Sequence, residues 1–159
     1  MLISNYFKNV SFKNKKHYFS GLSFNSSRCK INNIFFAIKG NKVDGNRFIN
    51  QAIKNGAKTI ISSKNFKGTI KGVLYIKSKN VRKLLSETAY RIFKEKPKNL
   101  IAVTGTNGKS SIANFYFQIL RLNKKKVASI GTLGIQTSSY KKKVSNTTLD
   151  PLELGYYLK

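Results

Sequence analysis

The sequence predicts an α/β protein in two parts: a small mixed α/β domain over residues 1–95, then the beginning of a second domain with a parallel sheet over residues 96–159. Short apolar runs alternate with segments in which apolar residues recur every three or four positions, which is typical of strands followed by helices. A polar, proline-containing stretch separates two such series at residues 94–99. Beyond it, a glycine-containing turn at residues 104–111 joins an apolar run to an amphipathic segment.

The first part contains strand and helix signals in alternation. Residues 45–55 predict a helix with Phe48, Ala52 and Ile53 on one face, and Gly56 predicts its end. A turn-rich stretch with two glycines separates the last two predicted strands. The buried strands are predicted at residues 34–38, 59–61 and 73–76.

The clearest helix signal spans residues 80–93, where apolar side chains follow the i, i+3, i+4, i+7 spacing. Residues 94–99 then break the pattern, because they are polar and because Pro97 disfavours a helical conformation at Lys96. We therefore interpret residues 94–99 as the linker between the two parts.

The second part opens with the apolar run at residues 100–103, which predicts a buried strand, and a further strand is predicted at residues 127–130. Between them a helix is predicted over residues 109–123. Asp150 followed by Pro151 predicts the start of another helix. Because one strand–helix–strand unit cannot cover both faces of a parallel sheet, we expect the chain to be a fragment. The predicted inner face of the helix consists of Ile112, Phe115, Tyr116, Ile119 and Leu120.

Composition excludes several classes of protein. Hydrophobic residues make up 40% of the chain, too many for a disordered tail, and one cysteine excludes a disulfide framework. No apolar run approaches the ~18 residues of a membrane span, so we expect a cytoplasmic protein with no membrane partner. The net charge of +26 raises nucleic acid as a partner. The charge is mostly lysine spread along the chain, which favours tolerant surface positions over a dedicated nucleic-acid surface.

The turn between the predicted strand and helix has the chemistry of a phosphate-binding loop. Gly105 and Gly108 permit a close approach of the backbone to a phosphate, and the helix that follows directs its positive end at the same place. Lys109 supplies a full charge and Ser110 a hydroxyl for Mg²⁺. The strict pattern G-x-x-x-x-G-K-[ST] fails at Val103. The candidate loop residues are Gly105, Thr106, Asn107, Gly108, Lys109, Ser110 and Ser111.

This loop resembles the T-G-T-N-G-K-[TS] nucleotide loop of the Mur ligases, whose central domain is of the P-loop type. Two further segments resemble the family member that adds a diamino acid as the third residue of the cell-wall peptide stem. The resemblance covers roughly residues 20–159. The two segments are Ile34–Gly40 with Val43–Gly45, Phe48, Gln51–Ile53 and Asn55–Ala57, and Asn146–Thr148 with Asp150–Leu154.

The resemblance implies an ATP-dependent ligase. ATP would phosphorylate the D-glutamate carboxylate of UDP-N-acetylmuramyl-L-alanyl-D-glutamate, and the amine of a diamino acid, meso-diaminopimelate or L-lysine, would displace the phosphate. Lys109 would act in catalysis and Ser110 would bind Mg²⁺, while residues 105–111 hold ATP. We expect the chain alone to be inactive. The substrate contacts implied by the resemblance are Phe24, Ser26, Asn41, Lys42, Val43, Asn146, Thr147 and Thr148.

One departure from the family concerns the first predicted substrate turn. The family has Asp-Ser-Arg where this chain has Asn25-Ser26-Ser27, followed by Arg28. Elsewhere, His17 and Cys29 lack catalytic partners nearby in the sequence, so we expect structural roles for both. Two alternatives stay open: a basic nucleic-acid-binding protein and a degenerate nucleotide-binding remnant.

Overall fold

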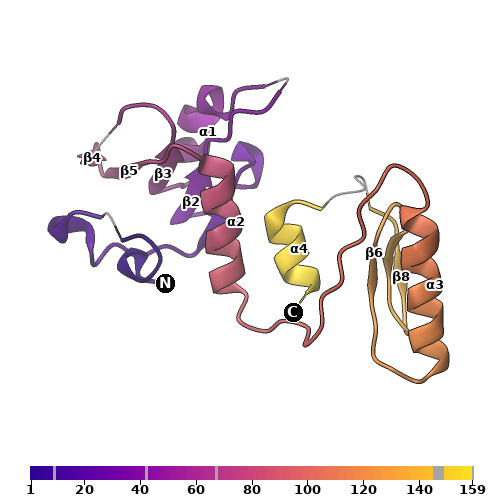
Figure 1. Cartoon of the computed structure of the whole chain (residues 1–159). Coiled ribbons are helices and arrows are strands. Elements are labelled where there is room, and N and C mark those ends of the chain that lie inside the picture. Colours follow the sequence, from indigo (N-terminus) through magenta and orange to yellow (C-terminus); the bar gives the residue numbers. More distant parts are fainter. Residues whose placement is uncertain (9, 42, 67, 145–148, 159) are drawn as a thin grey trace. The chain divides into compact units, whose positions relative to one another are not determined.

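The computed structural model describes residues 1–8, 10–41, 43–66, 68–144 and 149–158. The chain divides into two compact units, Met1–Lys94 and Glu95–Lys159. The first unit contains both helices and strands (Figure 1), and the predicted α/β class is confirmed. No helix within the described ranges is long and apolar enough to cross a membrane.

A five-stranded sheet in the order β1-β2-β3-β5-β4 forms the centre of the first unit. The first four strands in this order are parallel, and β4 pairs antiparallel with β5 at the edge. The strand predictions at residues 59–61 and 73–76 are confirmed, and that at 34–38 is confirmed as far as residue 36. The edge strand β4 was not predicted, because its residues are exposed and carry no apolar run. The strands are β1 (Gly21–Ser23), β2 (Asn33–Phe36), β3 (Thr59–Ser62), β4 (Gly68–Ile70) and β5 (Val73–Lys77).

The core of this unit lies around β2 and β3, in which every residue is buried. Continuous burial is expected for parallel strands that are covered on both faces. Phe35 of β2 and Ile60 of β3 are at most 1% exposed. They belong to a cluster with Cys29, Ala37, Ile49, Ala52, Ala57 and Val73.

The helical region at residues 45–55 is built from two pieces. A 3₁₀ helix, Gly45–Phe48, leads directly into α1 (Ile49–Lys54). The predicted inner face was partly wrong, since Phe48 is 38% exposed while Ile49 is buried. The tighter 3₁₀ turn has three residues per turn and so changes which side chain faces the sheet. Three more 3₁₀ helices span Ile3–Asn5, Phe12–Asn14 and Ser26–Arg28.

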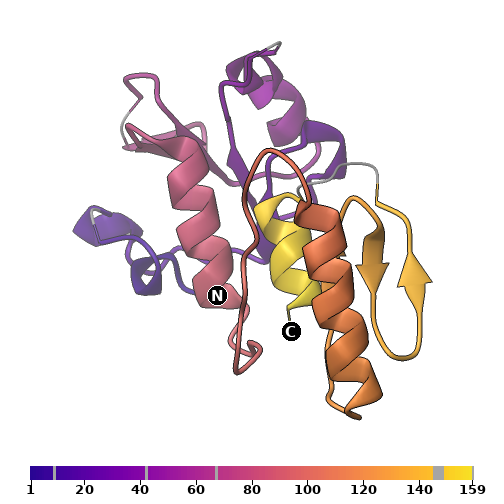
Figure 2. The same cartoon turned by 45° about the vertical axis from the view of Figure 1, so that its right-hand side comes forward.

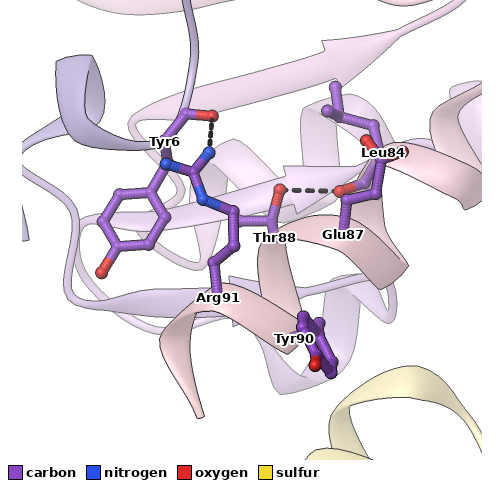
Figure 3. Close-up of a pocket in the computed structure, with 6 residues that line it drawn as sticks. All are labelled: Tyr6, Leu84, Glu87, Thr88, Tyr90 and Arg91. Atoms are coloured by element: carbon purple, nitrogen blue, oxygen red, sulfur yellow. Dashed lines mark hydrogen bonds between the residues drawn. The ribbon is translucent and has the colours of Figure 1, made fainter. Parts of the chain in front are cut away.

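The longest helix of the unit, α2 (Val81–Ile92), confirms the prediction at residues 80–93. Asn80 caps it by accepting a hydrogen bond from the backbone N–H of Lys83 at 2.9 Å. Near its other end, Arg91 stacks over the Tyr6 ring, 5.3 Å from the centroid, and donates to the carbonyl oxygens of Tyr6 (2.8 Å) and Asn5. Figure 3 shows this contact beside a cavity of about 260 Å³. Arg91 therefore attaches the N-terminal segment to α2.

The second unit combines helices with a small antiparallel sheet, β6-β7-β8. Asp150 accepts hydrogen bonds from the N–H groups of Leu152 and Glu153 at 2.8 and 2.9 Å, which confirms the predicted helix start. Lys142 donates to the Tyr157 hydroxyl at 2.7 Å and so joins β8 to α4. The elements are α3 (Lys109–Leu122), β6 (Ser129–Gly131), β7 (Gly134–Gln136), β8 (Lys141–Lys142) and α4 (Pro151–Tyr157).

The predicted strand at residues 100–103 was wrong. These residues form no strand, and Leu100 and Ile101 are 71% and 59% exposed. A strand needs a neighbour to satisfy its backbone groups. Within the described part of the second unit, β6 pairs with β7 instead, and no strand pairs with residues 100–103.

The predicted inner face of α3 was also wrong for four of its five residues, since only Leu120 is half-buried. Phe117 is 4% exposed, whereas Phe115 and Ile119 are 62% and 57% exposed. The strand β6 contacts α3, and the hairpin that contains it lies beside the helix in both views (Figures 1 and 2). The exposed apolar stripe of α3 consists of Ile112, Phe115, Tyr116, Ile119 and Leu122.

Candidate functional site

The candidate phosphate loop leads directly into α3. Its two glycines have positive φ angles, 147° at Gly105 and 76° at Gly108, and Gly108 is the N-cap of the helix. A side chain at such angles would cost roughly 1–2 kcal/mol, so glycine suits both positions. The loop residues from 104 to 111 are all exposed. The loop therefore presents its backbone to solvent at the beginning of a fourteen-residue helix.

Lys109 folds back over this loop. Its ammonium donates hydrogen bonds to the carbonyl oxygens of Gly105 and Thr106, the second at 3.0 Å. The first N–H groups of a helix have no acceptor within the helix, and they carry its positive partial charge. A full charge and several donors are thus gathered at one end of α3, which fits the phosphate groups of a nucleotide.

Ser110 lies next to a hydroxyl that the sequence did not point to. Its Oγ is 3.4 Å from Oγ1 of Thr132, which lies in the short connection between β6 and β7. Hydroxyl oxygens suit Mg²⁺, a hard cation that prefers oxygen ligands. The residues of the loop therefore fit both a phosphate chain and its magnesium ion. Thr132 was missed because 22 residues separate it from Ser110 and no spacing rule connects them.

The first predicted substrate turn follows β1. Phe24 is 36% exposed, whereas Ser26 is only 6% exposed. Asn25, which stands where the family has aspartate, caps the 3₁₀ helix by accepting from the Ser27 N–H at 2.9 Å. An amide oxygen therefore performs the capping that a carboxylate could perform here. The departure from the family pattern leaves the turn formed.

The second predicted substrate turn follows β2. Gly40 donates its N–H to the carbonyl of Val43 at 2.9 Å, and the Val43 side chain is 51% exposed. The backbone N–H and then the side chain of Asn46 hold the pKa of Asp44 below its usual value. Asn41 lies in this turn, while Lys42, Asn146, Thr147 and Thr148 lie outside the described residues.

Strand order brings the two turns to one edge of the sheet. Because β1 and β2 are adjacent and parallel, with Ser23 paired with Phe35, their carboxyl ends point the same way. Ligands of open α/β sheets commonly bind at this edge. The structure thus places Phe24 and Ser26 at the same edge as Asn41 and Val43, within the first unit.

The single histidine lies away from these turns in the sequence, whereas the single cysteine directly follows the 3₁₀ helix Ser26–Arg28 and donates its N–H to the Ser26 carbonyl at 3.2 Å. Burial lowers the pKa of His17, and it raises the pKa of the Cys29 thiol, whose side chain is in the core cluster. Within the described ranges, no group of three or more His, Cys, Asp or Glu side chains is placed to hold a metal ion.

Comparison with known proteins identifies the family. The model of the "Mur ligase family, catalytic domain" matches residues 18–91, which lie in the first unit. The chain belongs to the Mur ligase family.

Within this family, the chain is similar to UDP-N-acetylmuramoyl-L-alanyl-D-glutamate–2,6-diaminopimelate ligases. It is 48% identical to that of Rickettsia prowazekii over 128 residues, which are 80% of this chain and 26% of the relative. It is 34% identical to ligase 2 of Clostridium acetobutylicum over 145 residues, 87% of this chain and 30% of the relative. The chain spans about a quarter of the length of the curated relatives it matches.

Two solved structures share the fold. A solved UDP-N-acetylmuramoyl-L-alanyl-D-glutamate–2,6-diaminopimelate ligase matches 99% of this chain and 32% of its own, with a TM-score of 0.78 and 25% identity. The MurF ligase of Thermotoga maritima in complex with ADP matches 84% of this chain and 28% of its own, with a TM-score of 0.57 and 23% identity. The second likeness supports the fold alone.

Proposed function

We propose that this chain supplies the nucleotide loop and part of the substrate-binding surface of an ATP-dependent ligase of peptidoglycan precursor synthesis. The main observation behind the proposal is that the Lys109 side chain lies over the loop at the beginning of α3 and donates to two of its carbonyl oxygens. It is supported by relatives named as diaminopimelate ligases. We propose residues 1–95 as the UDP-muramyl-binding domain and residues 96–159 as the beginning of the ATP-binding domain.

The proposed reaction forms an amide bond in two steps. A carboxylate oxygen of the D-glutamate of UDP-N-acetylmuramyl-L-alanyl-D-glutamate attacks the γ-phosphorus of ATP, which gives an acyl phosphate and ADP. The amine of a diamino acid, meso-diaminopimelate or L-lysine, then attacks the acyl carbon. Phosphate leaves with the bonding electron pair, and the amine loses a proton. Such a reaction depends mainly on positioning and on neutralising phosphate charge.

Each loop residue has a role that its position supports. The N–H groups that begin α3 donate to phosphate oxygens, and the Lys109 ammonium exchanges its carbonyl acceptors for the β/γ-phosphates. The Ser110 hydroxyl binds Mg²⁺, which when bound neutralises charge on the phosphate oxygens. Thr106, Asn107 and Ser111 complete the ATP site.

The remaining contacts serve the muramyl substrate. Phe24, Ser26 and the turn at residues 41–43 bind the uridine end, and residues 146–148 bind the dipeptide end. Soluble nucleotide substrates place the reaction in the cytoplasm. Because the 159 residues span about a quarter of the relatives' length, we expect them to bind nucleotide without completing ligation.

Calorimetric titration of ATP–Mg²⁺ into the 159-residue chain tests the nucleotide site. Removal of a charge-assisted contact in Lys109→Ala should weaken binding by at least about tenfold. Lys125→Ala is the matched control, because it removes the same charge from an exposed position of the same unit. Equal ATP affinities for wild type and Lys109→Ala would refute the proposal. Tight binding of duplex DNA with a steep salt dependence would then favour the nucleic-acid alternative.

A further inference from the structure

Gln51 of α1 and Asn55, the C-cap residue of α1, bind the same residue of the first substrate turn. The Ser26 hydroxyl donates to Oε1 of Gln51 at 2.7 Å, and Nδ2 of Asn55 donates to the Ser26 carbonyl at 2.9 Å. Gln51 and Asn55 are four residues apart, so they lie on one face of the helix. Ser26 is 6% exposed and separated from them by 25 and 29 residues of sequence.

These bonds change the role expected of Ser26. A hydroxyl has one proton to donate, and here it is given to Gln51. Towards a ligand, the Ser26 hydroxyl can therefore act only as an acceptor while this bond is kept. The residues of this turn that face solvent are Phe24, Asn25, Ser27 and Arg28. Ser26 therefore matters for ligand binding mainly because it fixes where the turn lies, and less because its hydroxyl contacts the ligand.

Local hydrogen bonds shape the turn without fixing its place in the unit. Asn25 accepts from the Ser27 N–H at 2.9 Å, and the Ser23 hydroxyl donates to the Asn25 carbonyl at 2.7 Å. Both bonds join residues two apart in the sequence. The contacts of Gln51 and Asn55, by contrast, connect the turn to a different element.

That element is also continuous with the second substrate turn. The chain runs from Val43 through the 3₁₀ helix Gly45–Phe48 straight into α1. Gly45 donates its N–H to the Ile38 carbonyl at 2.9 Å, which holds the beginning of this segment at the end of β2. The helix α1 therefore joins the turn after β2 covalently and the turn after β1 through Gln51 and Asn55.

We propose that Gln51 and Asn55 are positioning residues that hold the turn after β1 in register with the turn after β2, so that both contact one uridine nucleotide. This inference rests on the proposed function. Both side chains are exposed, so they can be changed without creating a cavity in the core. Neither residue contacts the ligand in this account; each acts through Ser26.

The test measures UDP binding to the 159-residue chain by calorimetry, with Gln51→Met, Ser26→Ala and the double variant. Methionine keeps the length of the side chain and removes the acceptor. Loss of one hydrogen bond should weaken UDP binding about fivefold in either single variant. The double variant should be no weaker than the weaker single variant, because both changes remove the same bond. Asn55→Ala tests the second bond separately and should also weaken binding severalfold.

Thr88→Val is the matched control. The Thr88 hydroxyl is buried and donates to the Leu84 carbonyl of α2 at 2.6 Å, away from both turns in the sequence. It should lower thermal stability and leave UDP affinity unchanged. Additive losses in the double variant, or a loss in Thr88→Val equal to that in Gln51→Met, would overturn the positioning role.

Amide hydrogen exchange separates this inference from the proposed function. The N–H groups of Ser27 and Cys29 should exchange faster in Gln51→Met than in wild type, whether or not UDP binds. Unchanged exchange would overturn the positioning role. If exchange responds while the wild-type chain fails to bind UDP, the assignment of the uridine substrate is overturned instead.

Discussion

Phe115 and Phe117 offer a matched pair for testing how α3 packs. The residues are of one type and lie two positions apart on the same helix, but Phe117 is 4% exposed and Phe115 is 62% exposed. Truncation of a buried phenylalanine to alanine costs about 3–5 kcal/mol of unfolding free energy, part of it from the cavity left behind. Since full burial of such a side chain contributes about 1.5–3 kcal/mol, Phe115→Ala should cost about 1 kcal/mol or less.

The difference between the two variants should therefore be about 2–4 kcal/mol, which corresponds to roughly a 30- to 700-fold difference in amide exchange rate. Hydrogen exchange of the α3 amides is the suitable assay, because it reports the opening of this helix separately from unfolding of the first unit. Phe117→Ala should accelerate exchange along α3 far more than Phe115→Ala. Equal acceleration, or a larger effect of Phe115→Ala, would refute the assignment of the buried face.

Three further changes have defined outcomes. Asn80→Ala removes the cap of α2 and should lower the free energy of unfolding, measured with urea, by about 1 kcal/mol. An unchanged free energy of unfolding would contradict the capping role of Asn80. Hydrogen bonds from Asn46 lower the pKa of Asp44 in the folded state. The ionised carboxylate should therefore contribute its full stabilisation above about pH 4, the pKa of the unfolded chain. That stabilisation should be lost as the pH falls through the lower pKa of the folded state. Asp44→Asn should make the free energy of urea unfolding depend less on pH in this acid range. An unchanged pH dependence would contradict the stabilising role of the Asp44 carboxylate. Thr132→Val should reduce the apparent Mg²⁺ affinity measured with ATP severalfold, while an unaltered Mg²⁺ titration would show that this hydroxyl is not at the metal position.

Much of the first unit could be predicted from the sequence. In β2 and β3 all residues are buried, and each strand has a short apolar centre, Ile34–Phe36 in β2 and Ile60 with Ile61 in β3, that stands out from its flanks. The helix α2 combines a capping asparagine, Asn80, with a long amphipathic repeat, and both signals are local. Local signals of this kind survive in a single sequence because they do not depend on distant partners.

The face of α3 could not be predicted because the helix is apolar over more than half of its circumference. One apolar set contains Phe115 and Ile119, and the neighbouring set contains Phe117. Periodicity identifies the helix, but only the partner element decides which set is buried, and here that partner is β6. The strand predicted at residues 100–103 was wrong for the same reason. A strand needs a neighbouring strand to pair with, and its own sequence does not specify that neighbour.

In the candidate site, too, local features could be predicted from the sequence and contacts between distant residues could not. The candidate phosphate loop could be predicted because its glycines, Lys109 and Ser110 all lie between residues 105 and 110, so the pattern is local. Thr132 and Gln51 were not found as site residues, because hydrogen bonds across 22 and 25 residues give no local pattern. These contacts depend on the folded backbone and required the structure.

The binding of nucleotide phosphate at the beginning of α3 is tested most directly by amide chemical shifts during an ATP–Mg²⁺ titration. The account predicts saturable shifts at residues 105–111, abolished in Lys109→Ala and retained in Lys125→Ala. Shifts spread evenly over the lysine-rich surface, with no response from residues 105–111, would contradict it.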